Sequence, residues 1–196
     1  FIVFYTLIEL SNTICSLTSL TCLDLFGCSK FDKLPEDLGN MVSLRRLILG
    51  GTAIKEIPLS VEFLIGLISL DLTDCKNFIF LPNSICILKS LFRICLSGCS
   101  NFVNLLENLG NLEGLREISL KGTAIEVLPT SIGSLTTLSS LELTNCKKFV
   151  CLPNTICSLK SHLKFVFFDA QIFQLARESG NLEGLREISL KGTAIE

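Results

Sequence analysis

The sequence predicts an α/β solenoid, with a parallel β-sheet on a concave side and loops or short 3-10 turns on a convex side. Three observations support this prediction. A block of similar pattern recurs along most of the 196-residue chain, with copies that begin at Leu20, Leu44, Leu67, Leu91, Leu115 and Leu138. Each block contains an alternation such as Leu70-x-Leu72, the period-two pattern of a strand with one buried face. One block cannot bury its own apolar side chains, so neighbouring copies must stack.

Residues 67–88, LISLDLTDCKNFIFLPNSICIL, give the repeat in its fullest form. The strand comes first. Cys75 then lies at the bend, where a small polar group can bind free backbone groups. We expect Phe78 to point inward, and Ile85 and Leu88 to close the coil on the convex side. The template is therefore L-x-x-L-x-L-x-x-C-x-x-F-x-x-L-P-x-x-I-x-x-L.

The pattern predicts a single domain of repeats over residues 1–196. It comprises a partial coil at 1–17, regular coils at 18–160, a degenerate coil at 161–181 and a truncated coil at 182–196. We therefore expect a solenoid that is cut open at both ends, without polar capping repeats over its core.

The regular coils are of two kinds. Coils with Cys in the bend, such as the one that begins at Leu20, are one residue longer than coils with Thr, such as the one that begins at Leu44. The bend residues form a ladder that we expect to be structural, and they are Cys28, Thr52, Cys75, Cys99, Thr123, Cys146 and Thr193. Glycines beside the ladder are expected to permit the sharp turn, and they are Gly50, Gly51, Gly98 and Gly122.

The degenerate coil departs from the template in three ways. His162 looks like an inserted residue that lengthens the preceding Cys coil by one position, Gln171 holds the ladder position, and the Leu-Pro step is missing. Val166 and Phe168 would keep the strand alternation. We expect a distorted coil here.

Composition favours a reducing compartment. Ten cysteines could indicate a secreted disulfide scaffold, but Cys15, Cys86 and Cys157 recur at a constant interval of three coils, which is too far for a bridge. We therefore expect free thiols and a cytoplasmic protein, with the nucleus as a second possible location. No apolar run reaches the ~20 residues of a membrane span. The net charge of −2, with mixed signs, argues against a nucleic-acid partner.

The sequence offers no catalytic, cofactor-binding or metal-ligating constellation. A nucleophile–base pair of Cys157 and His162 is conceivable, but a plain loop position beside a convex-face cysteine explains both residues. The set Cys146, Cys151, Cys157 and His162 lacks the spacing of a zinc site. We expect no enzyme activity, no cofactor, no metal and no small-molecule ligand.

The functional candidates are the outward positions of the strands, which would line the concave face. A solvent-exposed face without a binding role usually carries small polar residues. Apolar residues at these outward positions therefore favour a protein-contact surface. The alternative interpretation is that this face has no binding role. The predicted partner surface comprises Asp24, Phe26, Arg46, Ile48, Asp71, Thr73, Arg93, Cys95, Glu117, Ser119, Lys121, Glu142 and Thr144.

Coils of the template given above, which have Cys in the bend, are interspersed with coils that contain G-T-A-I. This arrangement resembles the leucine-rich-repeat region of plant TIR–NB–LRR disease-resistance proteins, most clearly over 25–41, 50–58 and 75–88. The resemblance implies a recognition or autoinhibitory module of an intracellular immune receptor. Its partner would be a protein: a pathogen effector, a host guard target or the receptor's own NB domain. Coils with L-P-x-x-I also occur in Ras-group repeat scaffolds. The alternatives are therefore an intracellular signalling scaffold of that kind or a truncated, non-functional gene copy.

Overall fold

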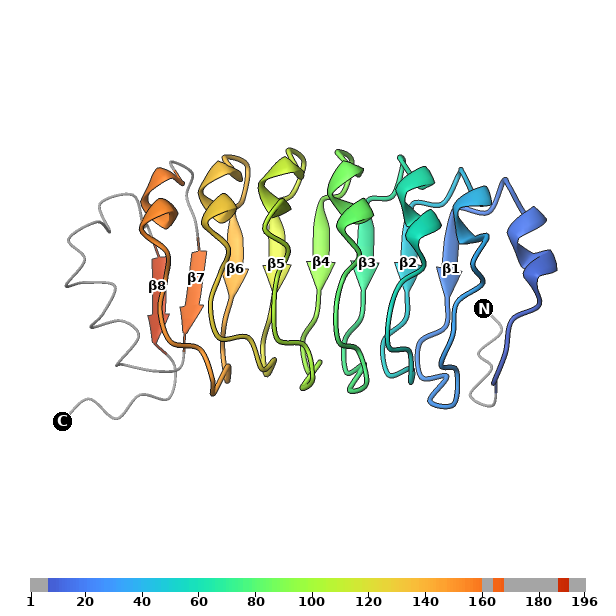
Figure 1. Ribbon diagram of the computed structural model, residues 1–196, viewed down its shortest axis with the longest axis horizontal. Coiled ribbons are helices and arrows are strands. Elements are labelled where there is room, and N and C mark those ends of the chain that lie inside the picture. The colour runs from blue at the N-terminus through green and yellow to red at the C-terminus, as the bar shows by residue number, and fades with distance from the viewer. Residues whose placement is uncertain (1–6, 160–163, 168–186, 191–196) are drawn as a thin grey trace.

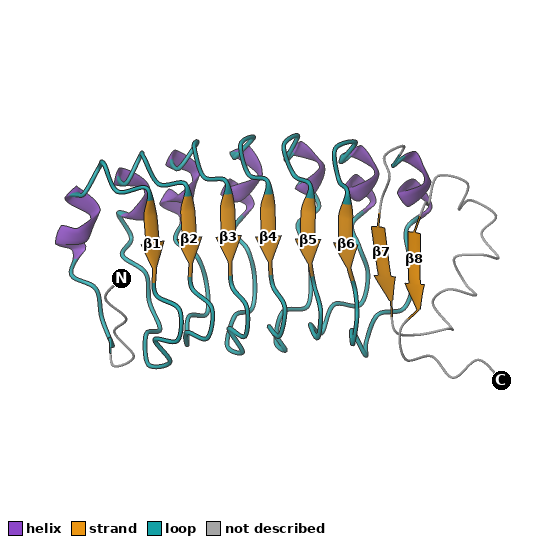
Figure 2. Ribbon diagram, turned by 180° about the vertical axis from the view of Figure 1, so that it is seen from behind, coloured by secondary structure: helices purple, strands orange, loops and turns teal. Residues whose placement is uncertain are grey.

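The computed structural model describes residues 7–159, 164–167 and 187–190, and within them strands alternate with 3-10 turns along a solenoid (Figure 1). The strands lie side by side on one face, and the 3-10 turns lie behind them (Figure 2). The elements, in chain order, are η1 (Asn12–Ser16), β1 (Cys22–Asp24), η2 (Leu38–Asn40), β2 (Arg46–Ile48), η3 (Leu59–Phe63), β3 (Ser69–Asp71), η4 (Asn83–Ile87), β4 (Arg93–Cys95), η5 (Leu109–Asn111), β5 (Glu117–Ser119), η6 (Thr130–Ser134), β6 (Ser140–Glu142), η7 (Asn154–Ser158), β7 (Lys164–Phe167) and β8 (Glu187–Leu190).

The strands form one parallel sheet in chain order from β1 to β8. Pairing aligns equivalent residues of successive coils, and the aligned inward residues are Leu23, Leu47, Leu70, Ile94, Ile118 and Leu141. These positions follow the predicted order of longer Cys coils and shorter Thr coils. The predicted solenoid, with its parallel sheet and short 3-10 turns, is therefore confirmed.

The core is a continuous stack that runs from coil to coil. Leu96 and Leu120, which directly follow β4 and β5, are completely buried. The rings of Phe78 and Phe102 stack across adjacent coils with centroids 6.0 Å apart and an interplanar angle of 16°. Because each side chain is covered by its counterparts in the next coils, every coil depends on its neighbours for burial.

Proline sets the start of most 3-10 turns. Pro58, Pro82, Pro129 and Pro153 are extended N-cap residues with ψ between 145° and 150°. The ring fixes φ near the value that the turn needs, and the missing N–H is not required at this position. These turns close each coil on the side opposite the sheet.

The register of β7 differs from the sequence-based expectation. The structure pairs Phe165 with Leu141 and Val166 with Glu142, one residue earlier than predicted. The coil from β6 to β7 therefore has the ordinary length of a Cys coil, without an insertion. The pairing of β7 with β8 is consistent with this register. Phe165 pairs with Ile188, so that apolar residues align across β7 and β8.

Residues 160–163 and 168–186, and with them His162, Phe168 and Gln171, lie outside the described residues. The same holds for 191–196, and hence for Thr193. The subdivision into partial, regular, degenerate and truncated coils stays a prediction.

Candidate functional site

Each strand from β1 to β6 is followed by one residue with a left-handed backbone, directly before the ladder position. These residues have φ between 58° and 77°, and they are Gly27, Gly51, Asp74, Gly98, Gly122 and Asn145. Glycine, aspartate and asparagine are the residues that accept this conformation most readily. Gly51, Gly98 and Gly122 therefore have the predicted role in the turn.

Gly50 has a different role from the one predicted. Its φ is not left-handed. A Cβ atom at Gly50 would lie 2.7 Å from the ring of Phe26, so the glycine makes room for that ring on the outer side of the sheet. Phe26 is 55% exposed despite this contact. The glycine thus shapes the surface and not the bend.

The ladder residues bind backbone carbonyls in two ways. The Thr52 hydroxyl donates to the Leu49 carbonyl of its own coil at 2.7 Å, whereas the Cys75 thiol reaches the same carbonyl from the following coil at 3.0 Å. Thr123 and Cys146 share the Leu120 carbonyl in the same manner, at 2.7 and 3.0 Å. Threonine thus closes its own bend, and cysteine ties its coil to the preceding one.

Burial keeps the ladder thiols protonated. It raises the pKa of Cys75, Cys99 and Cys146 above the usual value of 9.0, and it raises the pKa of the convex-side Cys86 to about 11. These groups are therefore hydrogen-bond donors at neutral pH and not nucleophiles. No disulfide links the cysteines whose side chains the structure describes.

The outward strand positions form the surface that we call the sheet face. Its middle row follows the strand pairing and consists of Asp24, Ile48, Asp71, Cys95, Ser119 and Glu142. A flanking row at the start of the strands contains Arg46, Arg93 and Glu117. The row that follows the strands contains Phe26, Thr73, Ser97, Lys121 and Thr144.

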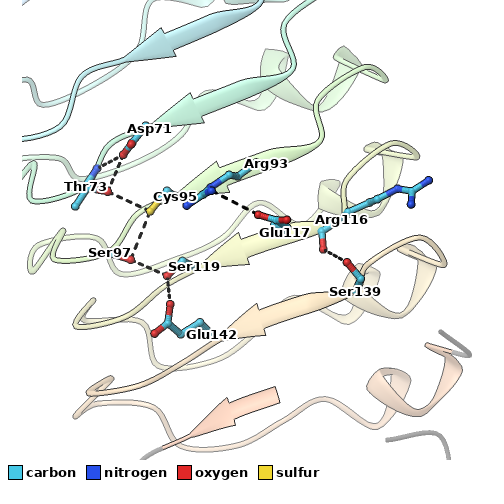
Figure 3. Close-up of polar contacts among 10 residues, drawn as sticks. All are labelled: Asp71, Thr73, Arg93, Cys95, Ser97, Arg116, Glu117, Ser119, Ser139 and Glu142. Atoms are coloured by element: carbon cyan, nitrogen blue, oxygen red, sulfur yellow. Dashed lines mark hydrogen bonds and ion pairs between the residues drawn. The ribbon is translucent and has the colours of Figure 1, made fainter. Parts of the chain in front are cut away.

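Polar side chains of the sheet face are hydrogen-bonded from β3 to β4 (Figure 3). The Thr73 hydroxyl donates to Asp71 Oδ1 at 2.6 Å, and the same oxygen accepts the Thr73 backbone N–H at 2.9 Å. Thr73 Oγ1 also lies 3.1 Å from Cys95 Sγ, whose thiol donates to Ser97 Oγ at 3.5 Å. Cys95 is only 6% exposed, so the chain of contacts covers it.

The same chain of contacts continues across β5 to β6. Ser97 Oγ and Ser119 Oγ are 2.6 Å apart, and the Ser119 hydroxyl donates to Glu142 Oε2 at 2.6 Å. Thr144 donates to the other carboxylate oxygen at 3.1 Å. We call this series of residues the hydroxyl–thiol chain: Asp71, Thr73, Cys95, Ser97, Ser119, Glu142 and Thr144. A carboxylate at each end holds the hydroxyl groups in fixed orientations.

Sequence reasoning missed Ser97, which joins the two halves of the hydroxyl–thiol chain. Its position was nevertheless recognisable. Ser97 directly precedes the left-handed Gly98, as Thr73 precedes Asp74 and Lys121 precedes Gly122. An alignment of the coils by their bends would have placed Ser97 among the outward residues.

Charged side chains of the sheet face are only partly paired. Arg93 Nη1 lies 3.7 Å from Glu117 Oε2, an exposed pair that contributes little to stability. Within the described part of the chain, neither Arg46 nor Lys121 takes part in an ion pair. Asp24 Oδ1 accepts the backbone N–H of Phe26 at 3.0 Å. Two cations and one exposed aromatic ring are thus available to a partner.

The described residues of the sheet face offer hydrogen-bonding and charged groups suited to recognition. Cys95 is contacted by hydroxyl groups, without a base to activate it. Among the described residues there is no group of three or more His, Cys, Asp or Glu side chains that could hold a metal ion. A surface depression of about 280 Å³ lies elsewhere, lined by Asp32, Glu36 and Lys55.

No helix within 7–159, 164–167 and 187–190 is long and apolar enough to cross a membrane. The side chain of Cys157 and all of His162 lie outside the described residues. The Cys157–His162 pair and the four-residue set, both disfavoured by the sequence, therefore cannot be placed.

Comparison with known proteins identifies the repeat. A family model of leucine-rich repeat regions matches residues 1–117 and 94–195. TMV resistance protein N of Nicotiana glutinosa is 32% identical over 155 residues, which cover 75% of this chain. A putative disease resistance protein of Arabidopsis thaliana is 32% identical over 195 residues, which cover 97% of the chain.

The chain spans 13% and 16% of the length of these two relatives. They confirm the predicted resemblance to plant disease-resistance proteins. A solved structure of a plant peptide hormone receptor, in complex with RGF2, has a TM-score of 0.61 and 23% identity, with coverage of 92% of this chain and 37% of the receptor. This likeness confirms the fold.

Proposed function

The chain belongs to the leucine-rich repeat family, and from this premise we propose that it is a protein-recognition module of an intracellular plant disease-resistance receptor. The sheet face is the proposed recognition surface. The observation that carries the proposal is the hydroxyl–thiol chain, which spans four strands and holds acceptor oxygens in fixed positions beside unpaired cations.

Rigidity supports a role in binding. The outward side chains stand on strands whose inward neighbours are buried, so the backbone beneath them has little freedom. Side chains that are already ordered lose little conformational entropy when a partner docks. Phe26, exposed at one end of the sheet face, supplies the aromatic contact that protein interfaces favour.

The mixed charge of the sheet face supports a protein partner. Asp24, Asp71, Glu117 and Glu142 alternate in chain order with Arg46, Arg93 and Lys121. Such a pattern complements another mixed surface and gives binding of moderate salt dependence. We propose a pathogen effector, a host guard target or the receptor's own NB domain as the partner, and a cytoplasmic or nuclear location. A catalytic role is not proposed.

The test is to graft residues 1–196 into a plant disease-resistance receptor and to measure association with its NB domain and with effector proteins. The variant carries Arg46→Glu and Lys121→Glu, both on the sheet face. Lys148→Glu serves as the matched charge reversal, because Lys148 is exposed and lies in the loop after the bend.

We expect the double variant to weaken association at least tenfold and the control to leave it unchanged. The proposal fails if the double variant binds every partner as the wild type does. It also fails if Lys148→Glu alone abolishes association.

A further inference from the structure

One row of side chains lies outside the sheet face, in the loops that lead into the strands. Arg45, Ile68, Phe92 and Arg116 each directly precede a strand, from β2 to β5. Backbone hydrogen bonds align them: Ile68 N–H donates to the Arg45 carbonyl at 2.8 Å, and Phe92 N–H donates to the Ile68 carbonyl at 2.8 Å. Arg116 N–H donates to the Phe92 carbonyl at 2.9 Å. We call this row the arginine rim, and it follows the upper edge of the sheet in Figure 2.

The centre of the arginine rim is apolar and exposed. Ile68 is 43% exposed and Phe92 is 38% exposed. Val42 and Ile65, in the loops before β2 and β3, are exposed as well. The row becomes polar beyond β5, where Ser139 precedes β6. The apolar surface is thus confined to part of the solenoid, although the fold repeats throughout.

Both flanking arginines are held in place by the protein. Arg45 Nη1 donates to the Gly66 carbonyl at 3.0 Å. A Cβ atom at Gly66 would overlap this guanidinium, so the glycine provides the space in which Arg45 lies. The guanidinium carbon of Arg116 lies 5.7 Å from the centroid of the Phe92 ring. Figure 3 shows that Arg116 points away from the hydroxyl–thiol chain.

The arginine rim has an uncompensated positive charge. In the described ranges, neither Arg45 nor Arg116 is within ion-pair distance of a carboxylate. Arg46, next to Arg45 on the sheet face, is also unpaired there. The whole chain, in contrast, has a net charge of −2. A complementary ligand must therefore carry negative charge on both sides of an apolar centre.

We propose that the arginine rim is a second docking surface, which binds an extended acidic–apolar segment of a partner protein. Three strand steps of ~4.8 Å separate Arg45 from Arg116 by about 14 Å. This is the backbone separation, and the Arg45 guanidinium lies at Gly66 while that of Arg116 lies over Phe92. An extended chain rises ~3.4 Å per residue, so two acidic residues no more than about four positions apart reach both guanidinium groups. One or two apolar residues between them cover Ile68 and Phe92.

Guanidinium chemistry favours a carboxylate-bearing protein segment over a lipid surface. Each arginine presents a planar set of donors that matches a carboxylate in two-point hydrogen bonding. A bilayer surface would instead require a continuous apolar face of several turns or strands. The arginine rim has its apolar centre between two fixed cations, which suits a short segment.

The experiment is a selection of displayed random 12-residue peptides against the 196-residue chain, followed by affinity measurements on synthetic copies. The variants are Arg45→Glu, Arg116→Glu and Gly66→Ala, the last of which displaces Arg45 without changing any charge. Lys76→Glu is the matched control, because Lys76 is exposed in the bend region, away from the rim. Thermal melting verifies that each variant is folded.

We expect enriched peptides to have acidic residues on both sides of apolar ones. Each arginine reversal should weaken their binding at least tenfold, Gly66→Ala should weaken it severalfold, and Lys76→Glu should leave it unchanged. The proposal is overturned if no acidic–apolar family is enriched, or if such peptides bind the arginine variants as tightly as the wild type. Parallel measurements use a single-stranded RNA and vesicles containing phosphatidylserine. Binding of either probe that depends on the arginines and exceeds peptide binding would also overturn it.

Discussion

Along strands β2 to β6, the two sides of the sheet differ in how far they repeat. The inward middle positions are all buried Leu or Ile: Leu47, Leu70, Ile94, Ile118 and Leu141. The residues that directly follow them are of five kinds: Ile48, Asp71, Cys95, Ser119 and Glu142. An inward residue packs against its own counterparts in the next coils, so its size and apolarity must be kept. An outward residue has no such constraint. The residue type at this position can therefore differ from coil to coil and serve recognition.

Substitution of an inward residue should lower the free energy of unfolding more than substitution of an outward residue. Leu96→Ala creates a cavity between filled coils and should lower the free energy of unfolding by ~2–5 kcal/mol. Cys95→Ser, the adjacent outward substitution, should change it by less than about 1 kcal/mol, because the hydroxyl keeps the same hydrogen-bond partners. Denaturant titration of both variants measures the difference. Equal losses would remove the distinction between the two sides.

Alkaline pH should lower the free energy of unfolding, because buried thiols are deprotonated. The pKa of Cys86 is raised from 9.0 to about 11 by burial, so the folded state binds the proton more tightly than the unfolded state. The stabilisation is complete below pH 9.0 and is lost as the pH rises toward 11. The free energy of unfolding should fall by about 2 kcal/mol from this group over that interval. Urea titrations at pH 8 and pH 11 should show a smaller fall for Cys86→Ala, and an equal fall would contradict the assignment.

The hydroxyl–thiol chain should contribute less than a core residue. Ser119→Ala removes contacts to Ser97 and Glu142, both at 2.6 Å, and should cost about 1 kcal/mol because these groups are partly exposed. Ser139→Ala is the control, since the Ser139 hydroxyl contacts only a backbone carbonyl. A loss for Ser119→Ala no greater than that of the control would show that the hydroxyl–thiol chain has no energetic role.

A proline at position 106 should have the smallest effect on stability. Leu106 holds the position that Pro35 holds in an earlier coil, and both carbonyls accept an N–H three residues later, at 3.0 and 3.1 Å. Leu106 N–H donates no backbone hydrogen bond within the described residues. Leu106→Pro should therefore stay within about 1 kcal/mol of the wild type. A loss greater than that of Leu96→Ala in thermal melting would mean that the coil follows another register.

The repeating inward side also explains what the sequence could predict. The coil boundaries and the sheet follow from the spacing of Leu and Ile alone, and strand pairing reproduces both coil lengths. The prediction was wrong at β7 because Leu163 resembles the first leucine of a coil. Strand pairing, and not that resemblance, aligns Phe165 with Leu141. A local pattern cannot distinguish two registers one residue apart when both contain apolar residues.

The outer surface was less predictable, because its contacts join residues from different coils. Ser97 and Ser119 lie in successive coils, yet their hydroxyl groups meet at 2.6 Å. The close approach of the Phe26 ring to Gly50 likewise depends on the stacking of adjacent coils. The role of the sheet face in binding a partner remains a prediction. These contacts show how the side chains of that face are arranged.

The most direct test of the separation between fold and recognition uses two consecutive residues that point in opposite directions. Leu120 is completely buried, and Lys121 is exposed on the sheet face. The measurement combines the free energy of unfolding with the affinity of the grafted chain for the receptor's NB domain or effector. We predict that Leu120→Ala loses ~2–5 kcal/mol of stability and that, under conditions where it remains folded, its affinity is unchanged. We predict that Lys121→Glu keeps its stability and loses affinity. A Lys121→Glu variant that unfolds like Leu120→Ala, or that binds like the wild type, would contradict the account.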